Sequence, residues 1–328
     1  MATGGQVRWG IVGTAEGAHA AFLPGLRAAG GTAAAVAGRD LGRAEQYARD
    51  NGIERAVVGY QALIEDPGVD ALYIALPNSL HAPWTIRALR AGKPVLCEQP
   101  LCGSLAETDR VLEVARQTGT SLWEAFVFPF QAQFQRVRAL LDDGVIGDLR
   151  EIYSNFHFDV RQPRNIRMSR NLEGGAVLHV GCYPVRLARE LFRAEHTAVL
   201  ANAEWGGGGV DVEAWGILDF PGGRKLLLSC GFRRAHDTFT RLQGTEGQIH
   251  LTNPFHPGPA DTYEVFAPGP RAGTRHAAGD EPSFTAAVRH INAVLNEEEA
   301  PRMLAVQTSL GTARALRDML ARVTVARA

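Results

Sequence analysis

The first part of the chain alternates short apolar runs with longer segments of mixed polarity. An apolar run over 7–12 leads into a Gly/Ala-rich turn and then a helix-like segment over 18–29. Because the same alternation recurs down to residue 125, we predict a parallel, doubly wound sheet with helices on both faces. The predicted strands are 7–12, 32–37, 71–75, 94–97 and 121–125, and the predicted helices are 18–29, 41–51, 83–91 and 105–118.

The pattern changes beyond this point. A segment over 130–141 has helical spacing and ends near Gly144. The runs that follow alternate apolar and polar residues between Gly/Pro turns, which predicts a mostly antiparallel sheet with one open face. Its strands are expected at 149–157, 198–205, 212–220, 225–232, 238–243 and 248–251, with helices at 176–192, 282–296 and 304–323.

A length of 328 residues is enough for two domains, and the change of pattern gives the boundary. We expect an α/β domain of the Rossmann type over 1–125 and an α+β domain over 126–328. The last helix, about 304–323, is expected to pack back on the first domain. The Pro/Gly-rich stretch 253–279 is expected to be a long surface loop with one short strand.

Composition excludes several classes of function. A net charge of −1 gives no electrostatic reason to expect nucleic acid or an anionic membrane as a partner. No run approaches the roughly 20 apolar residues of a membrane span, and the first six residues have no apolar signal core. The four cysteines are scattered, so we expect no disulfide scaffold, no metal site and a cytoplasmic location.

The turn after the first strand has small residues where a dinucleotide fingerprint requires them. Gly13 fits the tight turn, and Thr14 and Ala15 follow it, although Ala15 places a methyl group where a second glycine is usual. Such a turn lets backbone approach a pyrophosphate at the start of a helix. We therefore expect Gly13, Thr14 and Ala15 to contact a dinucleotide.

The residues after the second strand indicate which dinucleotide binds. An acidic residue there would hold the ribose hydroxyls of NAD, but this chain has Gly38 and Arg39. A small residue with a guanidinium suits a 2′-phosphate, so we expect NADP(H). The alternative is that Arg39 only caps or solvates the following helix.

Several motifs resemble the glucose-fructose oxidoreductase/inositol dehydrogenase/rhizopine-catabolism (Gfo/Idh/MocA) family. The run Cys97-Glu98-Gln99-Pro100-Leu101 is similar to its Glu-Lys-Pro signature, with Gln99 at the position of the lysine. The segments 76–81, 123–126, 165–167, 173–184 and 244–247 are similar to others. For the cofactor, the resemblance implies contacts from Leu76, Pro77, Asn78, His81 and Glu98.

The segment 173–184 resembles the second family signature, in which Tyr183 takes the acid/base position and His179 replaces an aspartate. Residues four apart lie on one face of a helix, so both side chains can point at one pocket. A phenol titrates near 10 and needs a neighbour to act at neutral pH. We expect Tyr183, His179 and Gln99 to be catalytic, and Arg167 to contact the substrate. His157, Asp159 and Arg161 are expected to be sheet-face or loop residues.

Together these features predict an NADP(H)-dependent oxidoreductase that acts on a ketone or alcohol group of a sugar-like or other small secondary metabolite, with Tyr183 as proton donor. Because the family lysine is Gln99, two alternatives remain open. One is a non-redox acid–base enzyme (a lyase, isomerase or cyclase), and the other is a catalytically silent NADP-binding protein. An open-faced sheet also predicts a homodimer or homotetramer formed through the C-terminal sheet.

Overall fold

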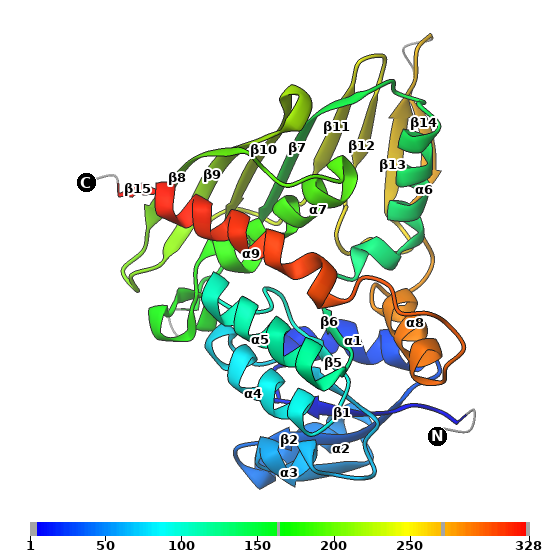
Figure 1. Ribbon diagram of the computed structural model, residues 1–328, viewed down its shortest axis with the longest axis vertical. Helices are drawn as coiled ribbons and strands as arrows, with labels where there is room; N and C mark the ends of the chain where they lie inside the picture. The colour runs from blue at the N-terminus through cyan, green and yellow to red at the C-terminus, as the bar shows by residue number, and fades with distance from the viewer. Residues whose placement is uncertain (1–4, 163–164, 270–272, 326–328) are drawn as a thin grey trace. The chain divides into compact units, whose positions relative to one another are not determined.

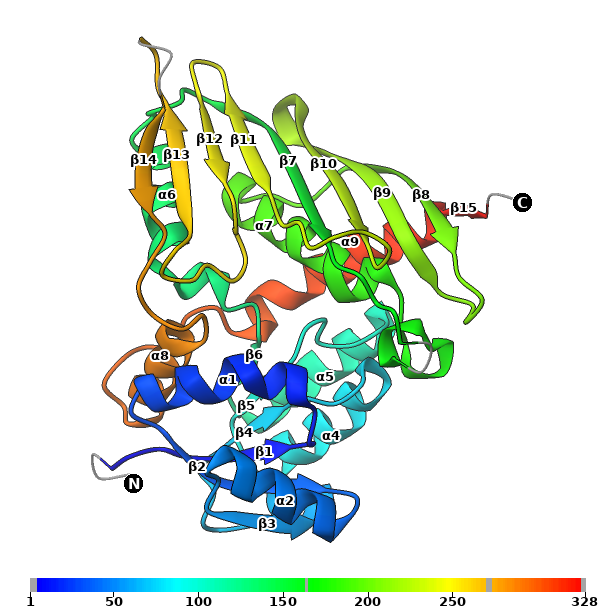
Figure 2. The same cartoon turned by 180° about the vertical axis from the view of Figure 1, so that it is seen from behind.

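The computed structural model describes residues 5–162, 165–269 and 273–325. The chain divides into two compact units, shown from two opposite sides in Figures 1 and 2. The first unit comprises residues 1–127 and 281–310, and the second comprises 128–280 and 311–328. Residues 281–310 therefore belong with the first part of the chain, although they follow the second unit in sequence.

The first unit is built on a six-stranded parallel sheet in the order β3-β2-β1-β4-β5-β6. This order confirms the predicted doubly wound arrangement, in which the chain reverses direction across the sheet between β1 and β4. The strand at 55–58 was not predicted, because it lies at the sheet edge and its two end residues are exposed. The strands are β1 (Arg8–Val12), β2 (Thr32–Gly38), β3 (Arg55–Val58), β4 (Ala71–Ile74), β5 (Val95–Cys97) and β6 (Leu122–Glu124).

Helices cover both faces of this sheet. In both views α1 (Glu16–Ala28) and α2 (Leu41–Asn51) lie on one side, and α4 (Asn78–Arg90) and α5 (Leu105–Thr118) lie on the other. The short α3 (Tyr60–Ile64) contributes Leu63 and Ile64 to the core. Apolar runs of strand length followed by amphipathic helices therefore bury the sheet apart from its edge strand β3, as a parallel sheet requires.

The segment after residue 280 completes the first unit through α8 (Thr285–Leu295). Helix α1 approaches it so closely that a Cβ on Gly25 would lie 2.5 Å from Cβ of Phe284. The indole of Trp9, buried in β1, donates to Asn292 Oδ1 at 3.0 Å. The following helix α9 (Ala305–Arg322) begins in the first unit, where Ala305, Val306 and Leu310 pack on the core, and ends in the second.

The second unit carries a mixed, mostly antiparallel sheet, also as predicted. Its order is β14-β13-β12-β11-β7-β10-β9-β8-β15, where β7 and β10 pair in parallel and β15 (Thr324–Val325) adds a two-residue edge. Helices α6 (Ala132–Asp142) and α7 (Cys182–Phe192) lie on one face, and Figure 2 shows the opposite face, which they leave open. The other strands are β7 (Leu149–His157), β8 (Ala198–Trp205), β9 (Asp211–Phe220), β10 (Arg224–Gly231), β11 (Thr240–Gly244), β12 (Gln248–Leu251), β13 (Thr262–Phe266) and β14 (Thr274–Ala277).

The glycine motif at 174–175 allows the chain to enter α7. Gly175 has φ +116°, and a Cβ there would overlap the carboxylate of Asp211. That buried carboxylate accepts a hydrogen bond from Val177 N at 2.6 Å and so caps the start of a π-helical turn, Val177–Gly181, which continues into α7. Burial raises the pKa of the Asp211 carboxyl. The motif is thus explained by a left-handed backbone and a close approach, both of which need glycine.

Among the helices of the described residues, none is long and apolar enough to cross a membrane. The four cysteines are buried and unbridged.

Replacement of Gly175 by alanine should destabilise the second unit by at least about 2 kcal/mol, because the new methyl group meets Asp211 and the residue must keep a positive φ. The matched control is Gly207→Ala, where a Cβ meets nothing within 4 Å. Urea unfolding of both variants should separate them clearly. Equal midpoints would contradict this explanation of the motif.

Candidate functional site

The residues predicted to bind a dinucleotide all follow strands of the parallel sheet and so lie at its carboxyl edge. Ligands of doubly wound sheets bind at this edge, near the point where the strand order reverses. Here that point lies between β1 and β4. The residues at this edge are Gly13, Thr14 and Ala15 after β1, Gly38 and Arg39 at the end of β2, Leu76, Pro77 and Asn78 after β4, and Glu98 and Gln99 after β5.

The turn after β1 packs so closely against the residues after β4 that only glycine fits at position 13. Its φ is +106°, and a Cβ there would lie 2.8 Å from the carbonyl oxygen of Ala75. The Gly13 amide donates to Ala37 O at 2.9 Å, which fixes the turn between two strands. Ala15 is exposed and occupies the N-cap position of α1. The positive end of the helix dipole at that position favours an anion.

The two residues that follow β2, Arg39 and Asp40, have different roles. Asp40 is the cap of α2, since its carboxylate accepts from Arg43 N at 2.8 Å. Arg39 is therefore not the capping residue, and its side chain is exposed directly after the strand. Gly38 is buried, and a Cβ there would lie 3.1 Å from Cβ of Ala44. A guanidinium next to a packed glycine fits the arrangement expected for a 2′-phosphate.

His81 links two of the segments at this edge. Its Nδ1 lies 2.9 Å from Pro100 O, and its Nε2 lies 2.8 Å from Leu76 O. The ring is buried in α4, and burial lowers the pKa of its imidazole. Both polar atoms therefore contact backbone carbonyls, so His81 holds the end of β4 close to the turn that carries Gln99.

The turn after β5 is fixed from several directions. Glu98 N donates to Ile74 O at 2.9 Å, and the hydroxyl of Tyr73 donates to the Glu98 carboxylate. Gln99 is half-buried and precedes a cis peptide bond to Pro100. The position that the resemblance assigns to a lysine thus lies on a well-anchored turn.

Glu124, at the end of β6, also anchors this turn, and the sequence analysis did not identify it as a site residue. Its Oε1 accepts from Leu101 N at 2.8 Å, and its Oε2 accepts from the hydroxyl of Ser309 at 2.6 Å. The carboxylate is only 7% exposed. An acidic residue directly after a buried strand was the available signal, but its partners lie 23 and 185 residues away in sequence.

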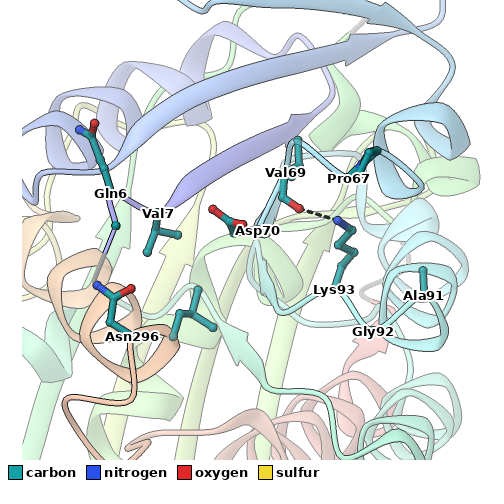
Figure 3. A pocket seen from close by; sticks show the side chains of 11 residues that line it. Gln6, Val7, Pro67, Val69, Asp70, Ala91, Gly92, Lys93 and Asn296 are labelled. Atoms are coloured by element: carbon teal, nitrogen blue, oxygen red, sulfur yellow. Dashed lines mark hydrogen bonds between the residues drawn. The ribbon is translucent and has the colours of Figure 1, made fainter. Parts of the chain in front are cut away.

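A cavity of about 550 Å³ opens at the other edge of the parallel sheet, where the strands begin (Figure 3). Val7, Asp70, Lys93 and Asn296 are among the residues that line it. The ammonium group of Lys93 donates to the carbonyl oxygens of Asp66 and Val69. Burial lowers its pKa. Lys93 therefore lies at the opposite end of β5 from Gln99.

In the second unit, Tyr183 lies in an aromatic environment on the helix-covered side of the sheet. Its side chain is 4% exposed, and its ring centroid lies 5.1 Å from those of Phe156 and Phe255. The hydroxyl oxygen lies 3.1 Å from Nε2 of His256. A buried phenol can donate a proton, and an imidazole next to its oxygen can stabilise the negative charge that remains on the phenolate.

His179 lies one helical turn before Tyr183 and has different neighbours. The π-helical turn over 177–181 changes the spacing from that of the α-helix assumed in the sequence analysis. The imidazole of His179 lies 6.4 Å from the Phe232 ring, edge to face. The guanidinium of Arg167 lies 5.4 Å from the centre of Phe158. Both residues therefore border the same group of aromatic rings as Tyr183, in which Phe156, Phe158 and Phe232 follow one another.

His157 alternates with Phe156 along β7 and so projects from the opposite, open face of the sheet. There its Nε2 lies 2.9 Å from the Ser229 hydroxyl, and the Glu213 carboxylate lies 3.7 Å from its Nδ1. Burial lowers the pKa of His157 to about 4. Asp159 and Arg161 form a surface ion pair. These residues are sheet-face and loop residues, as predicted.

Within the described residues, no group of three or more His, Cys, Asp or Glu side chains is arranged to hold a metal ion.

Two family models match the chain. Residues 7–126 match the oxidoreductase family with an NAD-binding Rossmann fold (Gfo/Idh/MocA), and residues 134–250 match a C-terminal domain of the same family.

Individual relatives cover most of the chain. It is 41% identical to a dTDP-3,4-didehydro-2,6-dideoxy-α-D-glucose 3-reductase of Streptomyces violaceoruber over 76% of this chain and 74% of that protein. It is 33% identical to an NADP(+) D-xylose 1-dehydrogenase of Haloferax volcanii over 78% of this chain and 79% of that protein.

Among solved structures, a 3-ketoreductase from Actinomadura kijaniata in complex with NADP and TDP-benzene matches with a TM-score of 0.89. The two are 29% identical, and the match covers 98% of this chain and 99% of that one. With both units matched by family models, and with a relative above 40% identity over three quarters of the chain, this protein belongs to the Gfo/Idh/MocA family of oxidoreductases.

Proposed function

We propose that this protein is an NADP(H)-dependent reductase of a keto group on a nucleotide-linked deoxysugar, with Tyr183 as the proton donor. The observation that carries the proposal is the 41% identity to a dTDP-ketosugar 3-reductase over about three quarters of both chains. The match to a ketoreductase in complex with NADP and TDP-benzene supports the same substrate class.

The residues at the carboxyl edge fit a dinucleotide. The turn at Gly13 packs its backbone against Ala75 O with no room for a Cβ, and it leads to the start of α1, where a pyrophosphate would approach. In the proposal Thr14 and Ala15 bind the pyrophosphate, and Gly38 and Arg39 bind the 2′-phosphate. The family resemblance assigns the nicotinamide side to Leu76, Pro77, Asn78, His81 and Glu98.

The bound nicotinamide supplies the hydride, and the chain's own residues supply the proton and hold the substrate. Tyr183 donates its hydroxyl proton to the oxygen of the keto group as that oxygen becomes an alcohol. Gln99 donates an amide hydrogen bond to the same oxygen, His179 polarises the phenol, and Arg167 contacts the substrate. A neutral amide at position 99 stabilises a developing negative charge less than an ammonium group does.

We expect Gln99, at the position that the resemblance assigns to a lysine, to be compatible with ligand binding. A lysine-to-alanine variant of the Actinomadura ketoreductase was also solved with both NADP and TDP-benzene. Binding of both ligands in that relative therefore does not require the substituted lysine. By analogy, we expect Gln99 to affect the rate of hydride transfer more than the affinity for NADPH.

We also propose that a second copy of this chain covers the open face of the sheet. The strand register aligns four apolar side chains across it: Leu200 pairs with Ile217, Ile217 with Leu227, and Leu227 with Tyr153. Three of them are exposed large hydrophobic residues. An apolar row on a flat sheet is typical of an interface between identical subunits.

NADPH should bind at least about tenfold more tightly than NADH, because an arginine–phosphate hydrogen bond is charge-assisted. Arg39→Asp should abolish the preference, whereas Arg49→Asp, the same charge change at the far end of α2, should keep it. Fluorescence titrations at one ionic strength would measure both affinities. A preference retained in Arg39→Asp would exclude Arg39 as the phosphate contact.

Purified protein should oxidise NADPH with a dTDP-linked keto-deoxysugar. Tyr183→Phe should lower kcat by about 10²- to 10⁴-fold, the usual contribution of a general acid, and leave the Kd of NADPH unchanged. Gln99→Lys should change the turnover rate strongly. Tight NADPH binding without oxidation of any keto-sugar in a panel would favour a non-redox or silent protein instead.

Ile217→Asp should convert an oligomer into a monomer, because it places a charge in the centre of the apolar row. Ala132→Asp introduces the same charge on helix α6 and should leave the oligomer intact. Light scattering coupled to size-exclusion chromatography gives the mass of each. A monomeric wild-type protein would refute the proposed interface.

A further inference from the structure

His256 is a chemistry-bearing residue that neither the family motifs nor the sequence pattern identified. It lies in the Pro/Gly-rich segment between β12 and β13. The stretch 253–279 was predicted as a long surface loop with one short strand, whereas the structure has two strands there, β13 and β14. The structure instead half-buries this residue and places its Nε2 3.1 Å from the hydroxyl oxygen of Tyr183. The two rings meet edge to face, with centroids 5.3 Å apart.

Hydrogen bonds between the Asn253 side chain and the backbone of His256 fix the loop around His256. The amide of Asn253 donates to His256 O at 2.7 Å, and its Oδ1 accepts from His256 N at 3.1 Å. Gln133 on α6 in turn donates to Asn253 O at 2.9 Å. The Asp261 carboxylate closes the far side of the loop by accepting from Gly258 N at 2.7 Å. The backbone on both sides of His256 is therefore held by hydrogen bonds.

Apolar packing fixes the ring next to it. Phe255 is fully buried and stacks on Phe156 of β7, with centroids 5.5 Å apart and an angle of 13° between the rings. Tyr183 packs against both of these rings. Phe156 and Phe255 thus hold the phenol of Tyr183 in place, and the hydrogen bonds of Asn253 place the imidazole of His256 next to the phenol oxygen.

The charge state of the imidazole limits what it can do. Burial, with a smaller contribution from the charge of His236, lowers the pKa of His256 to about 4, so the ring is neutral at pH 7. Among the described residues, His236 after β10 acts on the imidazole through its charge. Asp261 lies in the same loop as His256, and His179 lies in the π-helical turn that precedes Tyr183. A neutral imidazole of low basicity is a poor acceptor for the proton of a phenol, but it can donate through its own N–H.

We propose that His256 is a positioning residue that donates its Nε2–H to the hydroxyl oxygen of Tyr183 and stabilises the phenolate left when that tyrosine gives up its proton. This inference rests on the proposed function, because it takes Tyr183 as the proton donor. With its oxygen accepting from His256, the hydroxyl proton of Tyr183 points away from the imidazole and is available to a substrate.

The reaction balances with this assignment. The keto carbon gains a hydride from NADPH, which is oxidised to NADP⁺, and the keto oxygen gains the proton of Tyr183 as its O–H bond breaks. The negative charge moves to the phenolate oxygen, where the hydrogen bond from His256 strengthens because its acceptor is now ionised. Water reprotonates the phenolate after the product leaves. His256 is an uncharged donor that thus helps to stabilise the negative charge of the phenolate. The family resemblance leads one to expect a lysine for this role.

The titration of Tyr183 tests the hydrogen bond without any substrate. The protein contains six tyrosines, so labelling with [¹³Cζ]-tyrosine gives six signals, and the one lost in Tyr183→Phe is that of Tyr183. His256→Leu should raise the pKa of that phenol by about one unit, because a donor to the phenolate has been removed. His256→Gln, whose amide nitrogen can occupy the position of Nε2, should restore most of the shift.

The matched control is His250→Leu, a histidine of the same unit whose Nε2 contacts Gln248 rather than a tyrosine. It should leave the Tyr183 signal unchanged, and circular dichroism should show that all variants are folded. If the Tyr183 phenol titrates identically in wild type, His256→Leu and His256→Gln, the proposal is overturned.

Kinetics then separates this inference from the proposed function. If a keto-sugar is reduced, His256→Leu should lower kcat about tenfold and shift the alkaline limb of the pH–rate profile upward, while the Kd of NADPH stays constant. A restored profile in His256→Gln supports hydrogen-bond donation. A shifted Tyr183 titration without keto-sugar reduction would preserve the hydrogen bond but refute the reductase assignment. An unchanged titration of Tyr183 together with normal keto-sugar reduction would refute the hydrogen bond but preserve the reductase assignment.

Discussion

Parallel pairing of the strands is the constraint on which the first unit depends. When six strands run in the same direction, their carboxyl ends meet at one edge, and residues far apart in sequence become neighbours there. Gly13, Arg39, Asn78 and Gln99 each follow a different strand and meet for this reason alone. The burial of both faces by helices enforces the arrangement, because neither face can remain in water.

The edge is further organised by buried polar groups that each bridge two chain segments. His81 contacts the carbonyls of Leu76 and Pro100, and Glu124 accepts from Leu101 N and Ser309. A buried polar group without partners would cost about 1–3 kcal/mol, so these bridges tie the turn around Gln99 to the sheet and to α9. Gln99, at the position that the family resemblance assigns to a lysine, thus lies on a turn held by hydrogen bonds from several segments.

In the second unit the decisive feature is the separation of the two sheet faces. Alternation along β7 directs Phe156 toward Tyr183 and His157 toward the open face. One face therefore supports a cluster of aromatic rings around the phenol of Tyr183, whereas the other combines a buried polar cluster at His157 with the apolar row from Leu200 to Tyr153. The proposed proton donor and the proposed subunit contact therefore lie on opposite sides of a single sheet.

The sequence by itself determined the features that depend on neighbouring residues. Apolar periodicity predicted both sheets, and local turn chemistry identified Gly13, because a tight turn with a left-handed φ is encoded within a few residues. Gly38 was identified by its place at the end of the second strand, and the 173–184 segment by its resemblance to a family signature. Only the tertiary structure decided the rest. The partners of Glu124 and Tyr183 come from distant segments, and the π-helical turn at His179 is accompanied by a cap from Asp211 on another strand. The periodicity of one segment does not specify which distant segment packs on it. His256 could therefore be recognised only from the fold, which places it against Tyr183.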